Sequence, residues 1–126
     1  MDIRIYYEDT DSGGVVYYAN YLRYLERART EFFRQSGCDV GNLMKEGFVF
    51  VVTQVHLTYH FSARYNDVIQ IETHVEEVRK ASFILGHRIF LRENNVLVLE
   101  GQIKLACLGP GGKPKRFPDL MKQALT

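Results

Sequence analysis

The chain has 126 residues, of which 46% are hydrophobic and 25% charged, and its formal net charge is +1. This length suits a single domain, and the near-neutral charge provides no field that would favour nucleic acid. The longest apolar runs are too short to span a bilayer, and the first residues lack the basic and apolar regions of a signal peptide. Cys38 and Cys107 match no metal-ligand or CxxC spacing, so we expect two buried thiols in a cytoplasmic protein.

The N-terminal part of the chain predicts a short strand, a loop and one long helix. Residues 2–7 (DIRIYY) alternate in polarity and are rich in β-forming residues, which is typical of a strand. Residues 8–16 contain Asp, Thr, Ser and two Gly, which indicates a loop. From about residue 18 to residue 36 the apolar positions recur with helical spacing. Gly37 is suited to end this helix in a left-handed conformation.

One face of this predicted helix is apolar. We expect its buried stripe to contain Tyr21, Leu25, Ala28 and Phe32, widened by Tyr17, Tyr18 and Tyr24. Arg27 and Glu31 point elsewhere and are four residues apart, which is the spacing of a weak helical ion pair. A short helical turn is predicted over residues 40–47, with Gly47 at its end.

After Gly47 the hydrophobic period changes to two. This alternation predicts four long strands, at residues 48–61, 67–78, 82–92 and 96–108. The segments RKAS and ENN between the last three of them indicate hairpin turns. No proline falls within a predicted strand, and the tail at residues 117–126 predicts a short closing helix.

This order of elements predicts an α+β domain with a largely antiparallel sheet that spans residues 1–126. The apolar stripe of the helix has to be covered by one face of the sheet. The other face and the edges of the sheet remain partly open in a domain of this size. We therefore expect a homodimer or homotetramer in which the sheet continues into a second copy.

The pair Asp9 and Asp11 admits several interpretations. The spacing begins like a calcium loop, but Asn20 stands where such a loop places its bidentate Glu. A phosphatase-type aspartyl nucleophile is excluded, because such enzymes have a parallel sheet and a longer chain. An aspartic protease motif is excluded, because it needs glycine where Asp11 stands. On spacing alone, the two carboxylates suit binding of loop amides as well as they suit catalysis.

The longer stretch YYEDTDSGGVVYYANYLRYLERART resembles the signature of the YbgC-like acyl-CoA thioesterases, which are related to the 4-hydroxybenzoyl-CoA thioesterases. The shared pattern is Asp-x-Asp-x-x-Gly, two hydrophobic residues, and Tyr-x-x-Asn-Tyr. A weaker similarity continues to about Leu108. The resemblance implies the hotdog fold, a long central helix wrapped by a curved, largely antiparallel sheet of five strands. It also implies hydrolysis of thioesters of coenzyme A or acyl carrier protein.

The resemblance assigns roles to individual residues. It places the catalytic carboxylate on Asp11, as general base or nucleophile, and a carbonyl-polarising backbone amide at Tyr18. Free N–H groups at a helix start suit that polarising role. Many YbgC-like proteins have His where Tyr18 stands, so a supporting role of that histidine does not transfer. The other implied residues of the active-site loop are Gly13, Gly14, Tyr17 and Asn20. No metal or other cofactor is required, since coenzyme A is part of the substrate.

Two further groups of residues carry expectations. We assign coenzyme A phosphate binding to the hairpin turn with Arg79, Lys80 and Ser82, with solvated charge as the alternative. A second basic candidate consists of Lys113, Lys115 and Arg116. The four histidines lie on predicted strands, away from the helix start, which disfavours dehydratase chemistry. The function class left open is a non-catalytic hotdog module that binds acyl-CoA or a protein partner.

Overall fold

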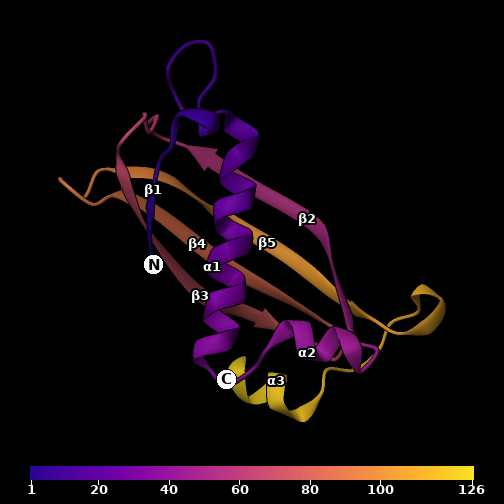
Figure 1. The fold of residues 1–126 in the computed structure, drawn as a ribbon. Helices are drawn as coiled ribbons and strands as arrows, with labels where there is room; N and C mark the ends of the chain where they lie inside the picture. The colour runs from indigo at the N-terminus through magenta and orange to yellow at the C-terminus, as the bar shows by residue number, and fades with distance from the viewer.

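The computed structural model describes all 126 residues and shows one long helix lying across a single sheet (Figure 1). The elements in chain order are β1 (Asp2–Arg4), the 3₁₀ turns η1 (Tyr7–Asp9) and η2 (Tyr18–Asn20), α1 (Tyr21–Gln35), α2 (Val40–Lys45), β2 (Val49–Tyr59), β3 (Val68–Val78), β4 (Ser82–Leu91), β5 (Leu97–Leu108), η3 (Pro110–Gly112) and α3 (Asp119–Ala124). The predicted α+β class and the predicted order of long helix and four long strands are confirmed.

The five strands form one antiparallel sheet in the order β1-β3-β4-β5-β2. The strands β3, β4 and β5 follow one another in space as they do in sequence. By contrast, β2 crosses to the far edge, where Val49 pairs with Leu108 and Tyr59 pairs with Leu99. One side of this eleven-residue strand is therefore unpaired, whereas the opposite edge strand, β1, has only three residues.

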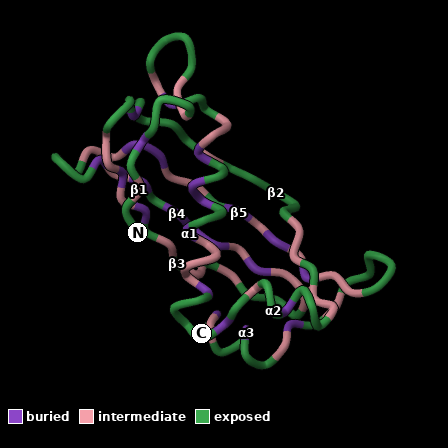
Figure 2. Tube along the Cα trace, viewed as in Figure 1, coloured by how far each residue is buried: buried purple, intermediate pink, exposed green.

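The hydrophobic core lies between α1 and the inner face of the sheet (Figure 2). The helix buries Tyr21, Tyr24, Leu25, Ala28 and Phe33. Side chains alternate along the strands, so that buried residues recur at nearly every second position of β4 and of the second half of β5. Gly37 ends α1 with a φ of +83°, and both cysteines are buried and unpaired, as predicted.

The start of the long helix differs from the prediction. The helix begins at Tyr21, because residues 18–20 form the tighter turn η2. This turn directs Tyr17 and Tyr18 outward, where they are 49% and 63% exposed, so they do not widen the buried stripe.

Three other details of the prediction are corrected by the structure. Phe33, and not Phe32, is the buried phenylalanine at the end of the stripe. Glu31 pairs with Arg34 and not with Arg27. The first strand is shorter than predicted, because the chain leaves the sheet after Arg4 and forms η1.

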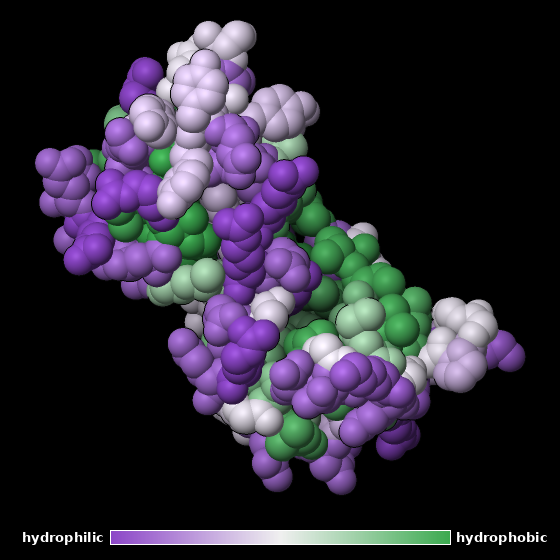
Figure 3. Space-filling model, viewed as in Figure 1, coloured by the Kyte–Doolittle hydropathy of each residue, from purple (hydrophilic) through white to green (hydrophobic).

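The helix leaves β2 largely uncovered. Val52, Val55 and Tyr59 pair in register with buried residues of β5 and so face the helix layer, yet they are 45–47% exposed. The space-filling view shows apolar surface along this side of α1 (Figure 3). An edge strand with an exposed apolar face is a surface suited to association. Separately, none of the helices is long and apolar enough to cross a membrane.

Candidate active site

The loop that carries Asp11 is a tight turn that projects beyond the start of α1 (Figure 1). The N–H of Asp11 donates to the Val15 carbonyl at 2.8 Å, and the N–H of Gly14 donates to the Asp11 carbonyl at 3.0 Å. Gly14 has a φ of +80°, which favours glycine. The N–H of Gly13 donates to Asp11 Oδ1 at 2.8 Å. The two glycines therefore shape the turn that presents Asp11.

The two aspartates of the motif have different surroundings. Asp9 Oδ1 accepts a hydrogen bond from the Asn20 amide at 3.1 Å, and Asp9 Oδ2 accepts one from the Tyr6 N–H at 2.9 Å. Asp9 also faces the buried Tyr24 hydroxyl: burial raises the pKa of Tyr24, and the Asp9 carboxylate raises it further. Asp11 is exposed, and its Oδ2 accepts no hydrogen bond within the chain. Asp9 is thus bound into the fold, whereas Asp11 keeps a free carboxylate oxygen.

Two backbone donors lie at the turn before α1. The N–H groups of Tyr18 and Ala19 make no hydrogen bond within the chain. Their neighbours are held: the Tyr17 N–H donates to the Asp9 carbonyl at 2.9 Å, and the Asn20 N–H donates to the Tyr17 carbonyl at 2.8 Å. Unpaired N–H groups at a helix start form the positive end of the helix dipole. They are suited to bind an oxygen on which negative charge develops.

A depression of about 340 Å³ lies beside Asp11 and the turn before α1. Its lining consists of Glu8, Asp9, Thr10, Asp11, Tyr17, Ala19, Asn20 and Arg23. The structure therefore brings together Asp11, Tyr17 and Asn20, three of the residues assigned to the site from the sequence. Tyr18, Gly13 and Gly14, the other residues assigned to the site, are not among the lining residues. The ring of Tyr18 packs on that of Tyr17, with ring centroids 4.9 Å apart.

Sequence reasoning assigned no role to four of the lining residues, Glu8, Thr10, Ala19 and Arg23, nor to Tyr59. The Tyr59 hydroxyl, at the end of β2, donates to the Tyr18 carbonyl at 3.0 Å. The two residues are 41 positions apart, so no local pattern announces the contact. It depends on the path of β2 along the sheet edge.

The basic residues assigned to coenzyme A lie at the opposite end of α1. Arg79 and Lys80 line a depression of about 420 Å³ together with Arg116 and Lys122. Val78, Leu125 and Thr126 complete its lining. The structure thus joins part of the second basic candidate to the first, and places neither beside Asp11.

Ser82 and Lys115 have other surroundings. The Ser82 carbonyl accepts a hydrogen bond from the Arg79 N–H at 2.8 Å and so closes the predicted β3–β4 turn. Ser82 does not line the basic depression. The ammonium group of Lys115 lies over the Phe48 ring, 3.9 Å from its centroid.

Comparison with known proteins identifies the family. Residues 6–125 match the model of the thioesterase-like superfamily. The acyl-CoA thioesterase YbgC of Haemophilus influenzae is 40% identical over 124 residues, which cover 97% of this chain and 90% of that protein. The acyl-CoA thioester hydrolase YbgC of Escherichia coli O6:H1 is 39% identical over 117 residues, covering 92% and 87%. This chain belongs to the YbgC group of the thioesterase-like superfamily.

The fold of this YbgC-group chain is the hotdog fold, as the sequence implied. Slr0204 from Synechocystis, a 1,4-dihydroxy-2-naphthoyl-CoA thioesterase, superposes with a TM-score of 0.93 at 19% identity, covering 99% of this chain and 93% of that one. At this identity the likeness concerns the fold alone.

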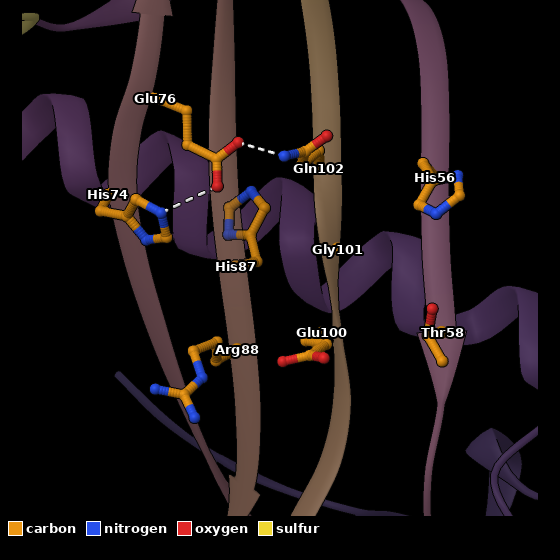
Figure 4. A pocket seen from close by; sticks show the side chains of 9 residues that line it. All are labelled: His56, Thr58, His74, Glu76, His87, Arg88, Glu100, Gly101 and Gln102. Carbon is orange, nitrogen blue, oxygen red and sulfur yellow. Dashed lines mark hydrogen bonds and ion pairs between the residues drawn. The ribbon is translucent and has the colours of Figure 1, made fainter.

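The histidines of this YbgC-group protein do not gather at Asp11. Three of them, His56, His74 and His87, are among the nine residues that line a polar depression of about 370 Å³, viewed with α1 behind the sheet (Figure 4). His74 Nε2 lies 3.0 Å from Glu76 Oε1. Gly86 makes room for this pair, because a Cβ at this position would collide with both side chains. The structure thus supports the interpretation that the strand histidines serve the surface and the packing.

Proposed function

We propose that this protein hydrolyses acyl-CoA thioesters, with Asp11 as general base or nucleophile and the Tyr18 amide polarising the thioester carbonyl. The observation that carries the proposal is the exposed Asp11 carboxylate, which lines a depression together with Tyr17 and Ala19, the residues on either side of Tyr18 in the turn with two unbonded N–H groups. A thiolate leaves readily, so thioester hydrolysis needs an activated nucleophile and a polarised carbonyl. Both parts are present at this end of α1.

Two routes use the same groups. In the first, Asp11 takes a proton from water, and the resulting hydroxide attacks the carbonyl carbon. The N–H of Tyr18 stabilises the negative oxygen, and collapse expels the coenzyme A thiolate, which recovers a proton from Asp11. In the second, Asp11 itself attacks, expels the thiolate and forms a mixed anhydride that water then cleaves. In either route, Gly13 and Gly14 shape the turn that presents Asp11.

We infer that the working unit contains a homodimer joined along β2. This strand is the longer free edge, and its helix-facing residues Val52 and Val55 are exposed although they are apolar. Pairing of two copies along β2 in an antiparallel, two-fold manner places the Tyr59 end of one strand beside the Val49 end of its partner. The active-site end of each subunit then lies beside the basic end of the other.

This arrangement explains why Arg79 and Lys80 lie far from Asp11 of their own chain. Eleven residues of β2 span about 35 Å at 3.3 Å per residue, and the basic depression lies at the sheet end where β2 begins. We propose that Arg79 and Lys80, with Arg116 and Lys122, bind the phosphates of a substrate whose thioester lies at the partner's Asp11. Ser82, which follows this turn on β4, is retained as a candidate contact.

A thiol-release assay tests the activity and the substrate together. The panel contains straight-chain and aromatic acyl-CoA thioesters, and the matching acyl carrier protein thioesters. We expect hydrolysis of at least one acyl-CoA class. A folded protein that binds acyl-CoA but hydrolyses nothing in the panel would favour the binding-module function instead. The cytoplasmic location stays a prediction.

Mixed dimers test whether the site is shared between subunits. One variant is Asp11→Asn, and the other is Arg79→Ala with Lys80→Ala and Arg116→Ala. In the proposed arrangement, a mixed dimer contains one site with an intact carboxylate and an intact basic anchor. Refolding the two variants together in equal amounts should make half of the dimers mixed, each with one complete site of two, and so restore about a quarter of the parental activity at low acyl-CoA concentration. If both parts act within one chain, no site is complete, and mixing restores nothing.

A further inference from the structure

We infer that Tyr59 is a positioning residue for the carbonyl-polarising amide, an inference that rests on the proposed function of Tyr18. Tyr59 ends β2, and its hydroxyl donates to the Tyr18 carbonyl at 3.0 Å. This bond ties the last residue of the sheet edge to the turn that precedes α1.

The turn before α1 is fixed on both sides of the free donors. On the N-terminal side, the Tyr17 N–H is held by the Asp9 carbonyl. On the C-terminal side, the Tyr18 carbonyl is held by Tyr59. The Tyr18 N–H lies between these two anchors in the chain. The Ala19 N–H belongs to the same peptide group as the Tyr18 carbonyl. Neither N–H group makes a hydrogen bond within the chain. Because a polarising donor has to be in place before charge develops, an anchor of this kind contributes to the rate.

Tyr59 is itself held in place. Its ring packs on the ring of Tyr21, with centroids 5.8 Å apart, and Tyr21 is 2% exposed. The Tyr21 hydroxyl in turn accepts a hydrogen bond from the Ala63 N–H at 3.2 Å. Burial raises the pKa of Tyr59, so its hydroxyl keeps the donated proton at neutral pH. The anchor is therefore attached to the core through Tyr21.

A hydrophobic role alone would require the ring of Tyr59 and not its hydroxyl group. Tyr59→Phe keeps the ring and removes the donor, so it separates the two roles. We expect kcat to fall about 3- to 10-fold, the effect of one net hydrogen bond, while KM stays within about twofold. Tyr65→Phe is the matched control, because Tyr65 is an exposed tyrosine without a hydrogen bond from its hydroxyl and packs edge-on against Tyr7. The control should keep parental kcat.

A vibrational measurement reports the polarisation directly. The probe is a non-hydrolysable acyl-CoA analogue in which a methylene group replaces the thioester sulfur and the ketone carbon is ¹³C. Bound to the parent, its carbonyl stretch should shift to lower frequency relative to water. Bound to Tyr59→Phe, part of that shift should be lost. Substitution of Tyr59 by 3-fluorotyrosine, which retains the hydroxyl, should keep both the shift and the rate at neutral pH.

The outcomes separate this inference from the proposed function. Parental kcat and an unchanged carbonyl shift in folded Tyr59→Phe would overturn the positioning role, even if Asp11→Asn is inactive. Parental activity of Asp11→Asn would instead overturn the proposed function. A loss of thermal stability in Tyr59→Phe with no change in kcat or in the carbonyl frequency would mean that the hydroxyl serves the fold only.

Discussion

The two ends of α1 differ in almost every respect. At the N-terminal end, an exposed carboxylate, free backbone N–H groups and several tyrosines surround a projecting loop. At the C-terminal end, the cationic side chains of four residues from the β3–β4 turn and the C-terminal segment surround a depression. The first set suits acyl transfer and the second suits phosphate binding, yet a length of β2 separates them. We propose that these are two half-sites, which are joined when a second copy pairs along β2.

The largest expected effect concerns the carboxylate at the N-terminal end. Asp11→Asn removes the negative charge that either a base or a nucleophile needs, so kcat should fall by about 10²- to 10⁴-fold or more. KM should change little, because in the proposed arrangement the coenzyme arm binds at the basic end of the partner subunit. Asp9→Asn is the paired variant. It weakens the bonds to Tyr6 and Asn20, and should lower stability while retaining a measurable rate.

Steady-state kinetics and thermal unfolding of both aspartate variants provide the check. If folded Asp11→Asn is as active as the parent, the thioester is not hydrolysed at this end of α1. A complete loss of activity in folded Asp9→Asn would show that the two aspartates do not have the separate roles that their contacts indicate.

The next effect concerns the β2 edge, which we propose brings the two ends together. Val55→Lys places a charge on an exposed residue near the middle of β2, where the two-fold axis would bring two lysines close together. We expect a folded monomer with little activity, because each half-site then lacks its complement. Analytical ultracentrifugation at micromolar concentration and a thiol-release assay measure the two consequences. A parent that sediments as a monomer would contradict the dimer.

A smaller effect concerns His87, which lies under the helix that connects the two ends. It is 1% exposed, with Nδ1 3.1 Å from the Thr73 hydroxyl and with no partner for Nε2. Burial, together with the charges of Arg29 and His74, lowers the pKa of His87 from 6.5 to about 4. Below pH 6.5 the unfolded chain binds a proton here that the folded chain does not bind. The folded state therefore loses stability as the pH falls from about 6.5 towards 4.

The expected loss from His87 is about 2 kcal/mol in the free energy of unfolding between pH 7.5 and pH 5. His87→Gln removes the titrating ring and keeps a side chain that can bond Thr73. Urea unfolding of the parent and the variant at both pH values isolates the contribution as the difference between their pH dependences. If both proteins lose the same free energy, His87 is not the source.

The smallest effect concerns the basic end. Arg79→Ala with Lys80→Ala should raise KM for acyl-CoA about tenfold and leave kcat nearly unchanged, because charges on the remote phosphates contribute mostly uniform binding. Glu77 already pairs with Arg79 at 2.9 Å, and this pairing limits the effect. The control is Arg88→Ala with Lys104→Ala, which removes the same charge from the outer face of the sheet. If KM is unchanged in the Arg79→Ala, Lys80→Ala variant, this turn does not bind the substrate and its charges are simply solvated.

Local patterns in the sequence determined most of the elements and the motif. The period of two predicted the four long strands, and the helical spacing with Gly37 predicted the end of α1, because periodicity and turn chemistry act over a few residues. The stretch of residues 6–30, from the DTDSGG loop into the helix, pointed to the family, and its separation from the strand histidines argued against dehydratase chemistry. These features depend on residues that are neighbours in the chain.

Only the tertiary structure decided how those elements are placed and which residues of different elements are in contact. The position of β2 at the far edge, beside β5, depends on pairing between segments about 50 residues apart, which no local period encodes. That position leaves β2 as a free edge and brings Tyr59 to the Tyr18 carbonyl. The different environments of Asp9 and Asp11 likewise arise from Asn20 and Tyr6, which fold back on one carboxylate and leave the other free. The spacing of the two aspartates in the sequence does not distinguish them. Their carboxylates differ in hydrogen bonding because only the folded chain brings donors to Asp9.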